Sequence, residues 1–464
     1  MEGKPNKKII LFATTLGAFM GPFMISSVNI ALPYIGREFT MNTVLLNWVI
    51  LSFILTRAVF ISPFGKLADI YGRKKLLMFG MAFCIISSIL CGISSSPIML
   101  IVFRVLQGIS TAPISIAVIS ILTSVFPQGE RGRAIGLNVA ATYIGLSSGP
   151  FLGGFLTQYL GWRSIFFFVV PIGMTVIILL LKVKQEWTGA KHEEFDYKGS
   201  FIYGLGLFGI VYGLSLIRSF WGPMLMLSGI IFILIFGYYE NKAKSPILNI
   251  KLLRRNRILI FSSLAALINY SATFAISYLL SLYLQYIKAL EPQQAGLVLV
   301  AQPVVQALFS PLAGRLSDRI EPRIVASLGM ALTAIGLTFY IFLTETTNII
   351  FIISALLIVG LGFAFFSSPN TNAVMCSVEK KYYGVASGII GTARSVGQAF
   401  SMGITSLIML IYIGNVQISP KHYPNFLVSV KIIFLVFTIL CFIGIFASIV
   451  RGTVNNEIEK KEFS

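Results

Sequence analysis

The sequence predicts an all-α polytopic membrane protein with fourteen transmembrane helices. Of its 464 residues, 56% are hydrophobic and only 11% are charged, and the mean hydropathy is +0.85. Soluble domains carry about 25% charged residues, so this composition excludes a soluble fold. Uncharged apolar stretches of about 18 residues or more, long enough to cross a membrane, recur along nearly the whole chain. We expect helices because lipid cannot satisfy the open edge of a strand.

The apolar stretches fall into two sets of six with a further pair between them. The first six spans are predicted at 9–33, 44–64, 76–95, 98–125, 134–157 and 164–183. The middle pair is predicted at 200–217 and 221–239, and the last six at 258–284, 294–313, 324–343, 349–377, 384–413 and 426–450. The predicted domains are an N-terminal six-helix bundle at 1–183, a central linker with two extra transmembrane helices at 184–257, and a C-terminal six-helix bundle with a short cytoplasmic tail at 258–464.

The net charge of +19 comes from basic residues whose placement indicates how the chain is oriented in the membrane. In a soluble protein it would suggest a nucleic-acid partner, but most of the 36 Lys and Arg lie in short loops on alternate sides of the predicted helices. Such a positive-inside bias predicts a multi-pass protein of the cytoplasmic membrane with both termini cytoplasmic, and no nucleic-acid partner. The four cysteines lie inside apolar segments and lack the spacing of metal ligands, so we expect neither a metal nor a cofactor.

An internal repeat supports the division into two sets. The segment Gly65-Lys-Leu-Ala-Asp69 follows the second span, and Gly314-Arg-Leu-Ser-Asp318 follows the tenth. Spans 1–6 therefore correspond to spans 9–14, and the middle pair is an insertion. Parallel repeats of this kind are typical of transporters whose two halves rock around a site near the membrane midplane.

The first copy of the repeat extends into Gly65-Lys-Leu-Ala-Asp-Ile-Tyr-Gly-Arg-Lys-Lys75. Gly65 and Gly72 permit a tight turn, Asp69 can face the positive end of a neighbouring helix, and Arg73 can pair with carboxylates when a gate closes. Gly314 and Asp318 are the matching gate residues of the second copy. The alternative is an ordinary basic anchoring loop. The segment closely resembles the loop between the second and third helices of the major facilitator superfamily.

Further stretches resemble one branch of that superfamily, the fourteen-helix drug:proton antiporters of the EmrB/QacA type. Together they cover both halves of the chain. They are, in chain order, Asn29, Ala31, Leu32 and Pro33 in the first span; Leu100, Arg104, Gln107 and Gly108 in the fourth; Gly145, Gly149, Pro150, Gly153 and Gly154 in the fifth; and Gly384 to Gly388, Arg394 and Gly397 in the thirteenth. The resemblance implies the major facilitator fold and export by antiport, with protons as the coupling ion.

The fifth-span stretch resembles that family's antiporter motif and has a mechanical interpretation. Small residues four apart let helices approach closely, and Gly149-Pro150 frees a backbone carbonyl and bends the helix. These residues are therefore candidates for a hinge at a surface that slides between two states. The alternative is that glycine stripes are common in any packed membrane bundle.

One position departs from the family and bears on the substrate. Five positions before Asn29 the family has an aspartate, where this chain has Met24, and all 17 Asp and Glu fall in or at the edges of predicted loops. Three arginines, Arg57, Arg104 and Arg394, lie within predicted helices. An electropositive cavity would favour neutral, zwitterionic or anionic amphiphiles over cations. Arg104 has a structural alternative, in which it bonds nearby backbone carbonyls, because an unpaired charge at mid-membrane is costly.

The candidate proton carriers all lie at loop edges. They are Glu38, Asp69, Glu130 and Asp318. The substrate cavity should be lined by polar and aromatic side chains from several spans. Besides Arg57 and Arg104, the candidates are Asn29, Gln107, Asn138, Tyr143, Asn269, Tyr270, Tyr278, Gln302, Gln306, Asn370 and Asn372.

The leading hypothesis is a multidrug-type exporter of hydrophobic or amphipathic compounds that works by alternating access, as a monomer in the lipid bilayer. The first alternative is a dedicated exporter of one endogenous anionic or lipid-like metabolite. A second alternative is a membrane sensor that has kept a transporter fold. An enzyme is disfavoured because no nucleophile, metal cluster or phosphate-binding loop occurs at the expected spacing. The sequence does not identify a periplasmic adaptor.

Overall fold

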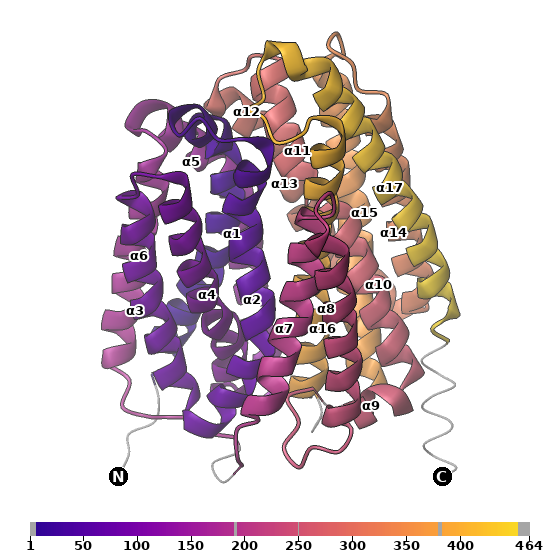
Figure 1. Ribbon diagram of the computed structural model, residues 1–464. Coiled ribbons are helices and arrows are strands. Elements are labelled where there is room, and N and C mark those ends of the chain that lie inside the picture. The colour runs from indigo at the N-terminus through magenta and orange to yellow at the C-terminus, as the bar shows by residue number, and fades with distance from the viewer. Residues whose placement is uncertain (1–5, 190–192, 249, 379–382, 453–464) are drawn as a thin grey trace.

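The computed structural model describes residues 6–189, 193–248, 250–378 and 383–452. Within these ranges all regular elements are helical. The long helices run roughly side by side, and α1 begins at the same end of the bundle at which α17 finishes (Figure 1). We call this the terminal end and the other the opposite end.

The first six helices form one group, drawn in indigo to magenta in Figure 1. Asparagine or serine precedes three of them, and each side chain accepts an N–H of the first turn, as N-caps do. The group comprises α1 (Lys7–Glu38), α2 (Thr43–Tyr71), α3 (Arg73–Gly92), α4 (Pro97–Val125), α5 (Gln128–Leu160) and α6 (Arg163–Leu181).

The inserted pair forms a helical hairpin of α7 (Tyr197–Ser215) and α8 (Trp221–Glu240). Along its length α7 packs against α8, α2 and α16, so the hairpin touches both groups of helices. The following stretch, expected to be only a basic loop, contains the short helix α9 (Ile250–Arg255).

The remaining helices form the second group, drawn in rose through orange to yellow. They are α10 (Arg257–Thr273), α11 (Ile276–Leu282), the π-helix η1 (Tyr283–Ile287), α12 (Pro292–Leu299), α13 (Ala301–Arg319), α14 (Pro322–Ile341), α15 (Ile349–Ser377), α16 (Tyr383–Tyr412), the 3-10 helix η3 (Pro420–His422) and α17 (Tyr423–Val450).

Two spans predicted as continuous helices, 258–284 and 294–313, are interrupted. Between α10 and α11 the backbone N–H of Ala275 donates to the Ser401 hydroxyl at 3.1 Å, so a side chain of α16 replaces a bond within the helix. Between α12 and α13, Pro303 has no N–H to donate to the carbonyl of Leu299, which explains the break there.

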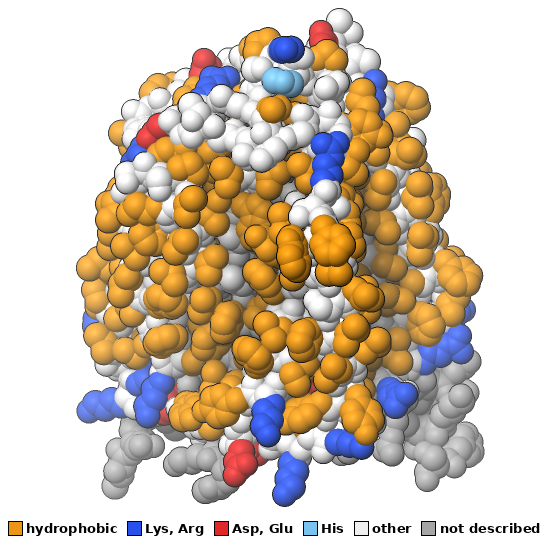
Figure 2. Space-filling model, in the orientation of Figure 1, with side chains coloured by type: hydrophobic (Ala, Val, Ile, Leu, Met, Phe, Trp, Pro, Cys, Tyr) orange, Lys and Arg blue, Asp and Glu red, His pale blue; other side chains and the backbone are white. Residues whose placement is uncertain are grey.

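Within the described residues, thirteen helices are long and apolar enough to cross a membrane. Each interrupted span counts as one of them. The helix expected as the seventh span is present as α7 but is not among the thirteen. Its 19 residues include Lys198, three tyrosines and five glycines, which lower its mean hydropathy. Hydrophobic side chains cover most of the middle of the visible face, and Lys and Arg lie mainly toward its two ends (Figure 2). The fold is that of a multi-pass membrane protein.

Candidate functional site

The gate motif forms the corner between α2 and α3 at the terminal end. Gly72 has a φ of 115°, which favours glycine. Gly65 does not lie in the turn as predicted, because α2 continues to Tyr71 and places it inside the helix, where an added Cβ would lie 3.3 Å from Ile116. Likewise Gly314 lies inside α13.

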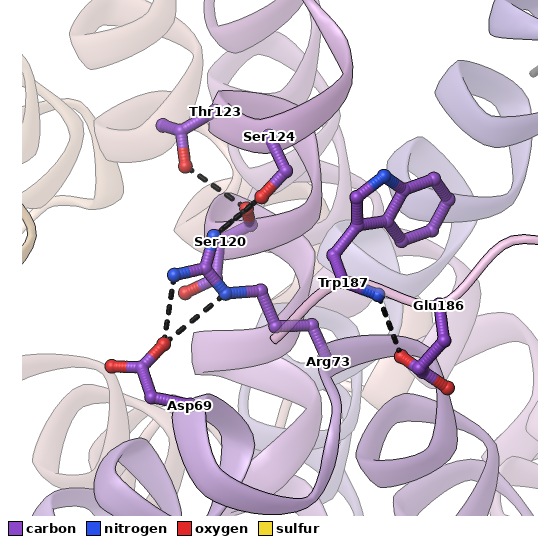
Figure 3. Close-up of polar contacts among 7 residues, drawn as sticks. All are labelled: Asp69, Arg73, Ser120, Thr123, Ser124, Glu186 and Trp187. Carbon is purple, nitrogen blue, oxygen red and sulfur yellow. Dashed lines mark hydrogen bonds and ion pairs between the residues drawn. The ribbon is translucent and has the colours of Figure 1, made fainter. Parts of the chain in front are cut away.

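Arg73 joins three helices at this corner (Figure 3). Its Nη2 and Nε donate to Asp69 Oδ1 of α2 at 2.7 and 3.2 Å. Its Nη1 donates to the carbonyl of Ser120 at 2.9 Å and to the Ser124 hydroxyl, both near the end of α4. The arginine therefore pairs with the carboxylate of its own motif and with the negative end of a helix.

The segment after α6 also binds this corner, which the sequence did not indicate. Glu186 accepts the backbone N–H groups of Lys74 and Lys75 at 2.7 and 3.1 Å, and thereby caps the start of α3. The carbonyl of Trp187 accepts the N–H of Arg73 at 2.9 Å. Figure 3 shows Glu186 and Trp187 beside the motif. The only sequence signal was a tryptophan within a charged stretch.

The second copy of the motif makes different contacts. Asp318 accepts the side-chain amide of Asn372 at 3.0 Å, and the same amide donates to the Ser317 hydroxyl at 3.0 Å. The second copy therefore ties α13 to α15. The two repeats therefore share a sequence pattern, but their side chains form different hydrogen bonds.

Arg104 and Gln107 lie inside the first group of helices, and both are 0% exposed. Arg104 Nε donates to the carbonyl of Val49 at 2.9 Å, and its Nη1 to Gln107 Oε1 at 2.5 Å. The guanidinium also lies 4.3 Å from the ring centre of Phe53. Gln107 in turn donates to the Ser88 hydroxyl at 2.8 Å. This geometry matches the structural alternative for Arg104.

Two predicted cavity asparagines also lie in the interior. The backbone carbonyl of Asn29 accepts the Ser281 hydroxyl at 2.6 Å, across the boundary between the groups. Asn370 donates to the carbonyl of Ser262 at 3.0 Å and accepts from Arg451 Nη1 at 2.9 Å. Arg451, only 1% exposed, was missed because it follows the last apolar stretch and has the sequence context of a loop residue.

Four predicted site residues and Arg394 meet where the two groups face each other, each near the middle of its span. We call them the arginine–tyrosine cluster: Arg57 of α2, Tyr143 of α5, Tyr270 of α10, Gln306 of α13 and Arg394 of α16. The Arg394 guanidinium lies 5.7 Å from the ring centre of Tyr270. Tyr270 also interacts electrostatically with Arg57 and with Tyr143, and Gln306 lies next to Tyr143.

Each arginine of the cluster is only partly bonded. Arg57 donates through Nη2 to the Ser115 hydroxyl at 3.3 Å, and Arg394 donates through Nη2 to the Thr371 hydroxyl at 2.6 Å. The Nε atoms of both are buried and have no hydrogen-bond partner. The hydroxyl of Ser310 on α13 donates to that of Tyr143 at 3.3 Å, which joins the two groups at this level.

Two further predicted residues carry unpartnered amide atoms. Asn269 is 0% exposed, and neither atom of its amide has a partner. Gln302 Oε1 is buried and also lacks a partner. A buried polar group without a partner costs about 1–3 kcal/mol, so these atoms favour the entry of water or of a ligand with matching polar groups.

The predicted hinge glycines of α5 form a contact surface. An added Cβ at Gly145 would lie 2.4 Å from the carbonyl oxygen of Phe19, and one at Gly149 would lie 1.8 Å from Ser26 Oγ, both on α1. Gly153 faces α1 in the same way. The α5 helix runs without interruption through Pro150, so in this structure the stripe serves close approach.

The same helix meets the second group near the opposite end. An added Cβ at Gly154 would lie 2.5 Å from the carbonyl oxygen of Pro292, and one at Gly296 of α12 would lie 2.1 Å from that of Pro150. Backbone therefore lies against backbone where α5 and α12 cross.

Most described hydrogen bonds between the two groups lie in the half of the molecule near the opposite end. Tyr34 donates to Glu291 at 3.0 Å, and the hydroxyl of Thr43 to the carbonyl of Gly414 at 2.6 Å. Toward the terminal end from the cluster, the described contact of this kind is between the hydroxyls of Ser62 and Thr392, at 2.7 Å. The groups are therefore joined mainly at the opposite end.

Comparison with known proteins places this arrangement in context. A sequence model described as the Major Facilitator Superfamily matches residues 14–286 and 262–463. The chain is 27% identical over 445 residues to the riboflavin transporter RibZ of Clostridioides difficile, covering 96% of this chain and 97% of the relative. It is 28% identical to the multidrug resistance protein Stp of Mycobacterium tuberculosis, covering 87% of this chain and 76% of the relative.

A solved structure shares the fold over almost the whole chain. It is a bacterial homolog of the human lysosomal transporter Spinster in an inward-facing, unoccupied conformation, with a TM-score of 0.71 and 16% identity over 97% of both chains. At this identity the likeness concerns the fold alone.

Proposed function

Because the chain belongs to the major facilitator superfamily, we propose that it is a secondary exporter of amphipathic compounds that works by alternating access. The protein is a transporter and not an enzyme. Some of its relatives carry names of multidrug efflux proteins, which supports export of hydrophobic or amphipathic compounds. We place the two bundles at 1–183 and 258–464, with the inserted linker at 184–257 between them.

The arginine–tyrosine cluster is the observation that carries the substrate proposal. It presents two guanidinium groups with unpartnered Nε atoms, one from each group of helices. The helices that supply the cluster contain Asp or Glu only near their terminal ends, at Asp69, Glu130 and Asp318. Without a carboxylate at this level, neutral and anionic amphiphiles are favoured over cations.

A single-metabolite transporter is the second candidate, and two observations favour it. One relative is named a riboflavin transporter and matches nearly the full length. In this chain, the rings of Tyr270 and Phe363 meet edge to face at 5.2 Å, close to the arginines. An aromatic ligand with polar substituents would suit such a surface.

The described state fits the inward-open step of the cycle. The positive-inside bias assigns the terminal end to the cytoplasm, and the contacts joining the two groups lie mainly toward the other side. In our proposal, substrate enters from the cytoplasm, the terminal ends close through the gate motifs, and the opposite end then opens.

Coupling to protons stays a prediction, because each loop-edge candidate already has a partner. The pairs are Glu38 with Arg163 at 2.7 Å, Asp69 with Arg73 at 2.7 Å, Glu130 with Lys7 at 2.6 Å, and Asp318 with Asn372 at 3.0 Å. Export by the reconstituted protein that is indifferent to an imposed pH gradient would exclude simple proton antiport.

Reconstituted transport tests the proposal directly. Proteoliposomes would be assayed with riboflavin, an anionic fluorescent dye and cationic ethidium. We expect Arg57→Gln and Arg394→Gln to lower transport of the anionic dye at least about tenfold, the factor for roughly 1.4 kcal/mol of lost interaction. Lys288→Gln, which removes a cation from the opposite end, is the matched control. Preference for ethidium in the unaltered protein would refute the substrate proposal.

A further inference from the structure

Two carboxyl groups lie at the terminal end of the inserted hairpin, away from the arginine–tyrosine cluster. Glu240 is the last residue of α8 and is only 2% exposed. Asp196 is the N-cap of α7, and its Oδ1 accepts the N–H of Gly199 at 2.8 Å. Because α7 and α8 run antiparallel along each other (Figure 1), the start of one lies beside the end of the other at the terminal end.

One oxygen of each carboxyl group is bonded and the other is not. Glu240 Oε1 accepts the backbone N–H groups of Ile247 and Leu248 at 2.9 and 3.2 Å. Asp196 Oδ1 also accepts the hydroxyl of Tyr239 at 3.2 Å. Glu240 Oε2 and Asp196 Oδ2 are both buried without a hydrogen-bond partner. Two ionised oxygens left in this state would each carry the full cost of losing water.

Among the described residues, the cation that interacts with Glu240 already has another partner. Glu240 interacts electrostatically with Asp196 on α7 and with Lys66 on α2. Lys66, however, is paired with Glu193 of the segment before α7. These four side chains comprise three carboxyl groups and one ammonium group, and the charge of Asp196 disfavours a charge on Glu240. A buried carboxyl group close to a second negative charge favours its protonated form.

We propose that Glu240 is a proton-binding site, kept protonated at neutral pH by its burial and by the neighbouring charge of Asp196. The proton comes from the cytoplasmic aqueous phase and forms an O–H bond with one carboxylate oxygen, and no other covalent bond changes. Neutral Glu240 accepts the backbone N–H groups of Ile247 and Leu248, which lie shortly before α9. Loss of the proton leaves two adjacent negative charges and weakens the connection between α7 and α8. The site does not involve the transported compound, so a test of it is independent of a test of the proposed function.

Infrared difference spectroscopy of the purified full-length protein tests the site without a transport substrate. We expect the unaltered protein at neutral pH to show the carbonyl band of a buried carboxylic acid, and Glu240→Gln to lose it. Glu194→Gln, which alters an exposed carboxylate two residues before Asp196, should keep the band. A neutral-pH band of equal strength in Glu240→Gln would overturn the proposal.

A second variant covers the case in which Glu240→Gln fails to fold. Removing the neighbouring charge with Asp196→Asn should let Glu240 ionise more readily, so its carbonyl band should disappear at lower pH than in the unaltered protein. An unshifted titration would contradict the role of Asp196 in keeping Glu240 protonated. Melting temperatures of the protein in sodium, potassium and choline salts test whether an alkali cation binds there in place of a proton. Stabilisation by sodium or potassium that is lost in Asp196→Asn would mean that an alkali cation occupies the pair, and would also overturn the proposal.

Discussion

Arg104 is held on three sides by groups of the first six helices: a backbone carbonyl of α2, an amide of its own helix and an aromatic ring. Its remaining nitrogen, Nη2, is buried without a partner. A guanidinium in this position stabilises the packing of α2 against α4. We expect its main contribution to be structural, with effects on transport that follow from stability.

Removing this side chain should destabilise the protein. Arg104→Ala loses two hydrogen bonds from a charged donor and a cation–aromatic contact, and should lower the free energy of unfolding by about 2–4 kcal/mol. The melting temperature of the purified protein in detergent measures this. Arg133→Ala, at an exposed position of α5, should change it little. Equal melting temperatures with transport abolished would show instead that Arg104 acts on the substrate.

Residue type alone predicted which side chains lie in the membrane interior but not which of them face each other. Arg57, Arg104 and Arg394 are all inside helices as expected. Only Arg57 and Arg394 lie at the boundary between the two groups, since that depends on the direction in which each helix turns its side chains once packed. Arg451 has the sequence context of a loop residue, and its interior position depends on contacts with Asn370 and Ser262, which are distant in sequence.

At the scale of elements, the start of α3 depends on a segment more than a hundred residues away. Gly72 precedes α3 and supplies no side-chain cap. Glu186 takes that role by accepting two N–H groups of the first turn. The segment at residues 186–187 is therefore fixed to the gate motif.

Loss of this cap should release the linker. Glu186→Ala removes an N-terminal cap worth about 1 kcal/mol, which corresponds to roughly fivefold more frequent opening. The rate of trypsin cleavage after the exposed Lys184, followed by mass spectrometry, should rise by a similar factor. Glu194→Ala on the same segment is the control, and equal cleavage rates in both variants would show that Glu186 does not hold the linker.

The lengths of the apolar stretches predicted the helices more accurately than they predicted the interruptions within those helices. The predicted spans correspond to helices because twenty or so apolar residues leave few alternatives in lipid. The breaks at Ala275 and Val300 were not predicted, because the first depends on a hydroxyl from α16. The turn at Gly72 was expected, but Gly65 and Gly314 lie inside helices, since a glycine can serve helix packing as well as a turn.

Across the whole molecule, the described state depends on close backbone contact near the opposite end. Gly154 and Gly296 let α5 and α12 approach until a side chain no longer fits between them. The cluster of arginines and tyrosines lies between this contact and the terminal end. A state open at the opposite end would have to separate α5 from α12, whereas the α1–α5 contact could stay intact within the first group.

A single methyl group at Gly296 should therefore shift the conformational balance. In Gly296→Ala the new Cβ would meet the carbonyl oxygen of Pro150 at 2.1 Å, and overpacking of this kind costs about 1–3 kcal/mol. This penalty applies only while the two groups are in contact, so the open population should rise by about five- to thirtyfold or more.

Spin labels at the exposed positions Tyr159 and Leu297 would report the open population as a second, longer distance in pulsed electron paramagnetic resonance. Gly391→Ala, where an added Cβ meets nothing within 4 Å, should leave the distances unchanged. If Gly296→Ala gave the same single distance as the unaltered protein, the crossing of α5 and α12 would not control which end is open.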